Sequence, residues 1–341
     1  MRKYRSVAAA VAGAVTCTAL AGIAPPAHSF GTLTDKLGQR AEHERITRAA
    51  LACPTGRAPD NYCFEPKSLE ELAGAEGKGG GIGAPDLGRE VLQPAAHCDN
   101  ADYLHQKGYP QSRADATKNL LGCIGHVRTR MNNALSDADR LLQRNGTVAP
   151  GQVDLSFRCV YNQAKGRAKC DVFEQFGRAM HAVQDFYSHS NWADTAGPQA
   201  LGATNPPGLG NSTPFPLFHP FRDPQPTAAD VPLNLSTGCF DGAAAISGEK
   251  RGCSGGKRIR HRVLNKDNGL IDPVTGAASD PTTDRGRIGT NFASAVALAI
   301  ADTRRQWRDL VAALEKRYPA GGKGRRMACA VTHDNPARDC R

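Results

Sequence analysis

Residues 173–192 read FEQFGRAMHAVQDFYSHSNW, and the fold prediction rests on this segment. Its apolar side chains recur with the 3.6-residue period of a helix that buries one face against a core. The members of this stripe are Phe173, Phe176, Met180, Val183 and Tyr187. The sequence therefore predicts a helix here that packs into the centre of the protein.

Beside this stripe, His181, Asp185 and His189 recur every four positions. A continuous helix would hold the three side chains within about 80° of arc. Imidazole nitrogens and carboxylate oxygens are ligands of Zn²⁺, and four-residue spacing lets two of them reach one ion. The competing interpretation is a helix with core histidines and a surface aspartate. Three such groups beside an aromatic stripe favour a metal site.

The start of the chain has the pattern of a signal peptide. Three of the first five residues are basic, residues 7–23 form an uncharged apolar run, and residues 27–29 form a small-residue cleavage site. The apolar run is shorter than the roughly 20 residues of a membrane-spanning helix. We predict that residues 1–29 are removed on secretion, and that residues 30–341 form a single mostly helical, metal-binding domain.

The cysteines agree with export. Of the 11 cysteines, Cys17 lies in the predicted signal peptide, which leaves an even number. An oxidising compartment would pair them, and no CxxC occurs that would indicate a cysteine-ligated zinc site. Spacing leaves several connectivities open, but it favours local pairs: Cys53–Cys63, Cys98–Cys123, Cys159–Cys170, Cys239–Cys253 and Cys329–Cys340.

The chain is basic, with a formal net charge of +10. Such a charge favours anionic lipid surfaces or nucleic acid as partners, but the basic residues are scattered rather than clustered. Charge alone therefore selects neither class.

Two further helices are expected, at about 124–142 and 291–317, each from an apolar face of helical period. Residues 193–260 hold nine of the 22 prolines and many glycines, so we predict a long irregular loop there. Its apolar turn PFPLFHPF is expected to face a substrate. No strand-like alternation occurs, and we predict four to six helices around the central one.

More residues of metal-ligand type lie outside the central segment. One histidine falls at one end of the buried stripe of another predicted helix, which begins near Ala41; one aspartate lies in a glycine-rich turn, and the others lie in loops. A core histidine or a turn aspartate would explain any one of them alone. No phosphate-binding GxxxxGK[ST] motif is present. The five residues are His43, Asp86, His97, His261 and Asp267.

The order of these ligand types resembles the zinc-dependent phospholipase C and zinc single-strand nuclease superfamily. The segment HAVQDFYSHSNW is similar to the equivalent helix of the fungal heterokaryon-incompatibility Het-C group and its bacterial relatives. The resemblance implies an all-α, multi-helix bundle of the zinc-dependent phospholipase C type, with long irregular loops stapled by disulfides. It also implies a cluster of two or three Zn²⁺ ions.

The resemblance assigns metal-binding roles residue by residue. Phe30, the mature first residue, would bind through its amine and carbonyl, and Asp86 would be both a bridging ligand and the catalytic group that orients water. The other implied ligands are His43, His97, His181, Asp185, His189 and His261. Asn265 stands where the superfamily carries its last carboxylate, so Asp267 is expected to substitute. Ser188, Ser190 and Asn191 would hydrogen-bond to the ligands.

The function implied by the resemblance is a secreted, monomeric zinc-dependent phosphodiester hydrolase similar to phospholipase C. Its substrate would be a phosphoester, and a phospholipid or membrane surface is the favoured partner. A zinc-dependent nuclease is the first alternative, although it would need aromatic platforms for bases and the chain has only two tryptophans. The second alternative is a non-enzymatic Het-C-like protein in which metal and disulfides stabilise the fold.

Overall fold

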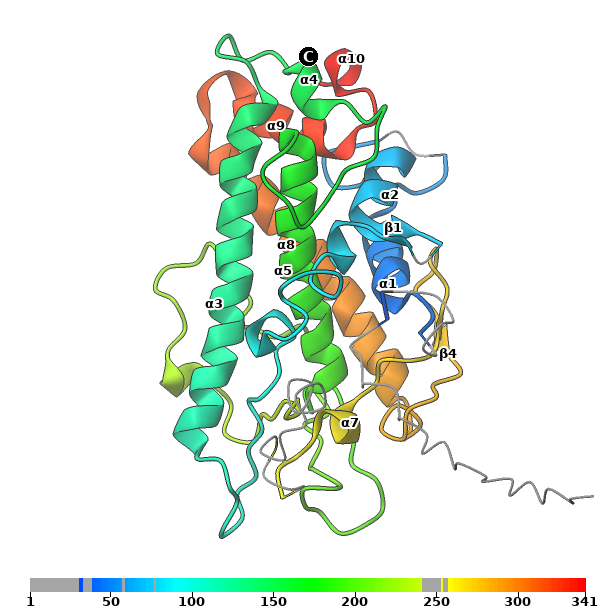
Figure 1. Cartoon of the computed structure of the whole chain (residues 1–341), viewed down its shortest axis with the longest axis vertical. Coiled ribbons are helices and arrows are strands. Elements are labelled where there is room, and N and C mark those ends of the chain that lie inside the picture. Colours follow the sequence, from blue (N-terminus) through cyan, green and yellow to red (C-terminus); the bar gives the residue numbers. More distant parts are fainter. Residues whose placement is uncertain (1–30, 33–38, 57–58, 77, 241–252, 254–256) are drawn as a thin grey trace, which may run out of the picture.

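The computed structural model describes residues 31–32, 39–56, 59–76, 78–240, 253 and 257–341. Three long helices dominate it (Figure 1): α3 (Arg113–Asp137), α5 (Ala168–His189) and α8 (Asn291–Arg317). Helix α5 packs against both of the others. Every residue of α5 is buried except the half-buried Gln175. The prediction of a central buried helix is confirmed, with a start five residues earlier than Phe173.

Short helices surround this framework. In the described part of the chain, the remaining α-helices are α1 (Glu42–Leu51), α2 (Pro66–Ala73), α4 (Pro150–Val153), α7 (His261–Leu264), α9 (Lys323–Thr332) and α10 (Pro336–Asp339). The 3₁₀ turns are η1 (Gly81–Gly83), η2 (Pro94–Ala96), η3 (Ala138–Leu141), η4 (Ala228–Asp230) and η6 (Ala320–Gly322). The protein is mainly helical, as predicted.

Two small antiparallel sheets were not predicted. Strand β1 (Gly74–Ala75) pairs with β2 (Lys78–Gly79), and β3 (Leu270–Ile271) pairs with β4 (Ala278–Ser279). Each strand has two residues, which is too short to leave an alternating pattern in the sequence.

Aromatic packing fixes α5 in the core. The ring of Phe176 meets Trp307 of α8 edge to face at 5.3 Å, and Phe186 stacks on Phe215 at 4.5 Å. Such pairs add to the free energy gained by burying apolar area. Phe215 and Phe218 belong to the turn PFPLFHPF and are buried. The prediction that this turn faces a substrate is therefore wrong for both residues, because they fill the core beside α5.

All five local disulfides are confirmed, as Cys53–Cys63, Cys98–Cys123, Cys159–Cys170, Cys239–Cys253 and Cys329–Cys340. This number of disulfides is typical of proteins from oxidising compartments, which agrees with the predicted secretion. Among the described residues, no helix combines the length and apolarity needed to cross a bilayer. The predicted signal peptide and Phe30 lie outside the described residues.

Candidate metal centre

Five of the predicted ligands meet in a first cluster on α5. Asp185 lies at its middle: its Oδ1 is 3.2 Å from His43 Nε2, and its Oδ2 is 2.9 Å from His97 Nδ1 and 3.2 Å from His181 Nε2. Asp86 Oδ1 lies 3.4 Å from the same His181 nitrogen. Segments far apart in sequence therefore deliver three imidazoles and two carboxylates to one place.

Outer hydrogen bonds orient the imidazoles. His181 Nδ1 lies 2.9 Å from the Ile82 carbonyl, and His97 Nε2 lies 3.2 Å from the Glu90 carbonyl. His43 Nδ1 lies 2.8 Å from Gln184 Oε1. Because a carbonyl oxygen only accepts, each of these nitrogens carries a proton, and the other ring nitrogen faces the cluster, where it could bind a metal ion once it is deprotonated. This is the arrangement by which proteins orient metal-binding histidines.

The amide of Gln184 is itself fixed. Its Nε2 donates to the hydroxyls of Thr47 and Thr303, each at 3.1 Å, so its Oε1 is turned toward His43. Gln184 and both threonines are fully buried. The tautomer of His43 is therefore set by a network that joins α1, α5 and α8.

The first described residues of the chain lie against this cluster. The Thr32 hydroxyl donates to Asp86 Oδ2 at 2.5 Å, and the Gly31 carbonyl accepts from the backbone N–H of His43 at 3.3 Å. The carboxylate of Glu42 accepts from the Gly31 N–H at 3.0 Å. Burial raises the pKa of Glu42 to about 7. The segment directly after Phe30 is thus hydrogen-bonded to the cluster.

A second cluster lies at the C-terminal end of α5. His189 Nε2 is 3.0 Å from Asp267 Oδ1, and His189 Nδ1 is 3.3 Å from Asp99 Oδ1. His261 lies 3.1 Å from Asp99 through Nδ1 and 3.4 Å from Asp267 through Nε2. Two imidazoles and two carboxylates therefore face one another. The two clusters touch, because His189 Nδ1 is also 3.2 Å from the carbonyl of His97.

Asp99 is a residue that the sequence did not identify as a ligand. It lies in a loop, where no periodicity marks it, between Cys98 and Asn100. Both neighbours have left-handed backbone, with φ of 53° and 68°, a conformation that is common for asparagine but costly for cysteine. The Cys98–Cys123 disulfide and the bond from the Asn100 N–H to the Gly238 carbonyl (2.8 Å) hold this turn. The proximity of His97, Cys98 and Asp99 in sequence was the available signal.

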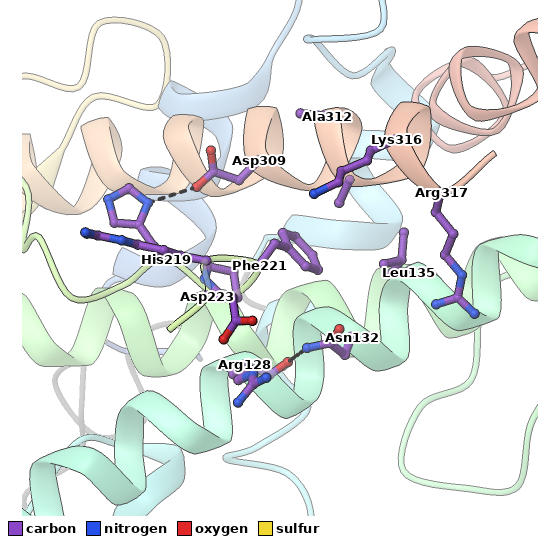
Figure 2. A pocket seen from close by; sticks show the side chains of 13 residues that line it. Arg128, Asn132, Leu135, His219, Phe221, Asp223, Asp309, Ala312, Lys316 and Arg317 are labelled. Atoms are coloured by element: carbon purple, nitrogen blue, oxygen red, sulfur yellow. Dashed lines mark hydrogen bonds and ion pairs between the residues drawn. The ribbon is translucent and has the colours of Figure 1, made fainter. Parts of the chain in front are cut away.

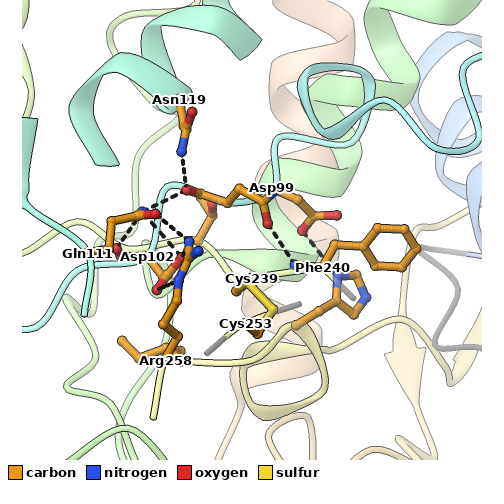
Figure 3. Close-up of a disulfide and its surroundings, with 12 residues drawn as sticks. Asp99, Asp102, Gln111, Asn119, Cys239, Phe240, Cys253 and Arg258 are labelled. Atoms are coloured by element: carbon orange, nitrogen blue, oxygen red, sulfur yellow. Dashed lines mark hydrogen bonds and ion pairs between the residues drawn. A yellow bond between two sulfur atoms is a disulfide. The ribbon is translucent and has the colours of Figure 1, made fainter. Parts of the chain in front are cut away.

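Residues 238–240 connect the segments that carry the second cluster. The Gly238 N–H donates to the His189 carbonyl at 2.9 Å, and the Cys239 carbonyl accepts from the His261 N–H at 2.8 Å. Figure 3 shows the disulfide that joins Cys239 of this segment to Cys253, with Asp99 and Phe240 nearby. The Phe240 N–H donates to Asn100 Oδ1 at 2.8 Å. One short segment therefore ties together the backbones that carry the residues of the second cluster.

The clusters are strongly coupled electrostatically. Burial alone would raise the pKa of each carboxyl group, but the facing imidazoles hold the pKa of Asp86, Asp99 and Asp185 below the usual range and lower that of Asp267 to about 2. Burial would likewise lower the pKa of His181, but Asp185 and Asp86 raise it to about 10. Without metal, these sites therefore hold protons that a cation would displace.

The donor set fits divalent metal. Three buried atoms of the two clusters lack a well-aligned hydrogen bond within the described part of the chain: Asp185 Oδ1 has the contact with His43 at 3.2 Å, and His261 Nε2 and Asp267 Oδ2 face each other at 3.4 Å. Buried polar atoms without hydrogen bonds are costly, and a cation between the facing ligands would satisfy them. Two divalent ions would also balance the charge of the four carboxylates. A third group, Cys329, His333 and Cys340, does not fit, because its cysteines are disulfide-bonded.

The three predicted outer residues have different partners. Ser188 Oγ donates to Asp267 Oδ1, which is a direct contact with a predicted ligand. Ser190 Oγ accepts from the Trp192 N–H at 3.3 Å instead. Asn191 donates to the carbonyls of Pro207 (2.8 Å) and Asn234 (2.9 Å), so it fixes loops rather than ligands.

Comparisons with known proteins add no identification: no family model, no curated protein and no solved structure matches this chain. The functional argument therefore rests on the geometry of the two clusters.

Proposed function

We propose that this protein is a secreted, zinc-dependent phosphodiester hydrolase that resembles the zinc-dependent phospholipases C. One observation carries the proposal: two buried histidine and aspartate clusters lie next to each other along one helix and share the His97 segment. Adjacent metal sites are a recurring way to bind and cleave phosphodiesters. The first cluster would hold one or two zinc ions and the second cluster one.

Bound zinc would supply Lewis-acid chemistry, polarising the phosphoryl oxygens and making water more acidic. The chain's own residues hold the site in place and define its polarity. Asp185 directs its two oxygens to different histidines, so it is suited to bridge two ions. Phe30 stays a predicted ligand, supported by the bonds of Gly31 and Thr32 at the first cluster.

Asp86 is our proposed catalytic residue. Its side chain is 14% exposed, whereas those of His43, His181 and Asp185 are fully buried. Substrate and water would therefore reach the first cluster on the side of Asp86. The Thr32 hydroxyl occupies one carboxylate oxygen, which fixes the direction of the other toward His181. In this position the carboxylate can orient a water molecule or accept its proton.

One observation favours a phospholipase-like activity over a nuclease: neither tryptophan of the chain is exposed to stack on a base. Both tryptophans are buried, at 6% and 1% exposure, so neither offers a face on which a base could stack. The non-enzymatic alternative predicts the same metal content but no turnover.

The test combines metal analysis with hydrolysis. Zinc-loaded protein lacking residues 1–29 should cleave bis-p-nitrophenyl phosphate or phosphatidylcholine vesicles, and single-stranded DNA more weakly. Asp185→Asn keeps the side-chain volume but removes the charge between His43, His97 and His181. We expect metal affinity to fall by about 10-fold or more, and turnover with it.

Asp284→Asn is the matched control, because Asp284 is exposed and lies outside both clusters. It should change neither metal content nor rate. Faster cleavage of single-stranded DNA than of either other substrate would establish the nuclease instead. Metal binding without any turnover would favour the non-enzymatic alternative, in which the metal only stabilises the fold. Less than one zinc per chain would refute the metal centre.

A further inference from the structure

A cavity of about 680 Å³ lies apart from both metal clusters. Helix α3 forms one wall, the C-terminal half of α8 forms the other, and residues 219–223 form the end (Figure 2). None of its lining residues belongs to either cluster. Its volume is within the range of small-molecule sites.

The rim of this groove is cationic. Arg128, Arg222, Lys316 and Arg317 line it, against only two carboxylates, Asp223 and Asp309. One of these carboxylates is already engaged, since Asp309 Oδ2 lies 3.6 Å from His219 Nδ1.

The cations of the two walls are available. Arg128 on α3 and Lys316 on α8 are both exposed, and within the described part of the chain neither side chain makes an ion pair. Figure 2 shows the two side chains on opposite sides of the groove. The four cations of the rim outnumber its two carboxylates, and an anion between the helices would meet positive charge from both walls.

The floor of the groove is apolar. Leu135 is 6% exposed, and Ala312 and Ala313 of α8 add two small apolar side chains. The half-buried ring of Phe221 projects between the two helices (Figure 2). Phe221 is the last aromatic residue of the turn PFPLFHPF, whose other two rings, Phe215 and Phe218, are in the core. It thus offers an apolar face at the centre of a basic rim.

We propose that this groove binds a small amphipathic organic anion. Its aromatic or aliphatic group packs on Phe221, and its single carboxylate, sulfonate or phosphate lies between Arg128 and Lys316. The cavity volume favours a molecule of this size over a polypeptide segment. The inference is independent of the hydrolase proposal, because no metal ligand lines the groove.

The probe is 1-anilinonaphthalene-8-sulfonate, which joins an aromatic body to one sulfonate and fluoresces when it is buried. We expect saturable binding at one site, which phenyl phosphate displaces and equimolar inorganic phosphate does not. The neutral analogue N-phenyl-1-naphthylamine should bind at least several-fold more weakly. The double variant Arg128→Glu/Lys316→Glu should raise the dissociation constant of the sulfonate about 10-fold, which corresponds to about 1.4 kcal/mol.

Lys118→Glu is the matched control: Lys118 is an exposed cation of α3 that does not line the groove, and its reversal should leave binding unchanged. The double variant Arg128→Lys/Lys316→Arg preserves both charges and should retain binding. It keeps the proposal testable if the charge-reversed variant does not fold. Asp185→Asn should bind the probe as the unmodified protein does, so a failed metal site does not affect this test. Equal binding of the neutral probe, or equal loss in Lys118→Glu, would overturn the proposal.

Discussion

At the scale of single residues, Asp185 is a second candidate, beside Asp86, for a bridging ligand. One Asp185 oxygen faces His43, and the other faces His97 and His181. The Asp86 carboxylate faces His181 and His97 through one oxygen, and its second oxygen accepts from Thr32. The bridging role that the resemblance implies for Asp86 stays a prediction, because ligand order in a sequence does not show which way a carboxylate turns.

His181 makes the stability of the metal-free protein depend on pH in a defined direction. Burial opposes its charge, but Asp185 and Asp86 raise its folded-state pKa to about 10, above the ordinary value near 6.5. A group with a raised pKa contributes stability that is complete below the unfolded pKa and disappears as the pH rises through the folded pKa. The contribution of His181 should therefore be lost between about pH 6.5 and pH 10.

We predict that His181→Gln destabilises chelator-treated protein strongly at pH 6.5 and much less at pH 9.5. The measurement is the free energy of unfolding by denaturant for both proteins at both pH values. Using the difference between the two proteins cancels other buried groups, such as Lys169, whose pKa burial lowers to about 7. A difference that is constant with pH would contradict the ion-pair interpretation of His181.

At the scale of elements, the crossing of η1 over α5 positions the first cluster. A Cβ added to Gly177 would lie 2.2 Å from the backbone carbon of Gly81, so the two elements touch backbone to backbone. This contact brings the Ile82 carbonyl to His181, and Asp86 follows a few residues later. The close approach depends on glycine for reasons of space alone, because α5 has ordinary helical backbone there.

Gly177→Ala should therefore displace η1 even though alanine is the better helix former. We expect a loss of about 1–3 kcal/mol of unfolding free energy, typical of overpacking, together with weaker metal binding. Gly125→Ala in α3 is the control, since nothing lies within 4 Å of the position of its added Cβ. That variant should gain up to about 1 kcal/mol. Equal effects of the two substitutions, measured by denaturant unfolding, would show that the crossing is not tight.

At the scale of the whole molecule, metal binding is expected to contribute to stability directly. The residues of the two clusters come from α1, α5, α7 and several loops, so the clusters exist only in the folded chain. A ligand bound only by the native state adds about 2.7 kcal/mol when its concentration is 100 times its dissociation constant. Chelation should lower the thermal midpoint at constant pH, and adding zinc back should restore it. An unchanged midpoint, with metal loss verified by elemental analysis, would refute this coupling.

The parts of the structure that could be predicted are those with long periodic signals. Helix α8 spans the predicted residues 291–317, because its apolar stripe continues over seven turns. The ligand types on α5 could be predicted for the same reason. The role of Asp99 could not be predicted, because its position depends on a strained loop. The burial of Phe215 could not be predicted either, because an apolar turn can face either a core or a ligand.

The disulfide pattern has a consequence for how the chain matures. Every bridge joins cysteines that are neighbours in the order of synthesis, separated by 10 to 25 residues. If the polypeptide enters the oxidising compartment with its N-terminus first, each cysteine meets its correct partner before the next pair arrives. An oxidase that joins thiols in order of appearance would then suffice, without an isomerase to reshuffle wrong pairs. The native connectivity is thus the one that vectorial oxidation produces by default.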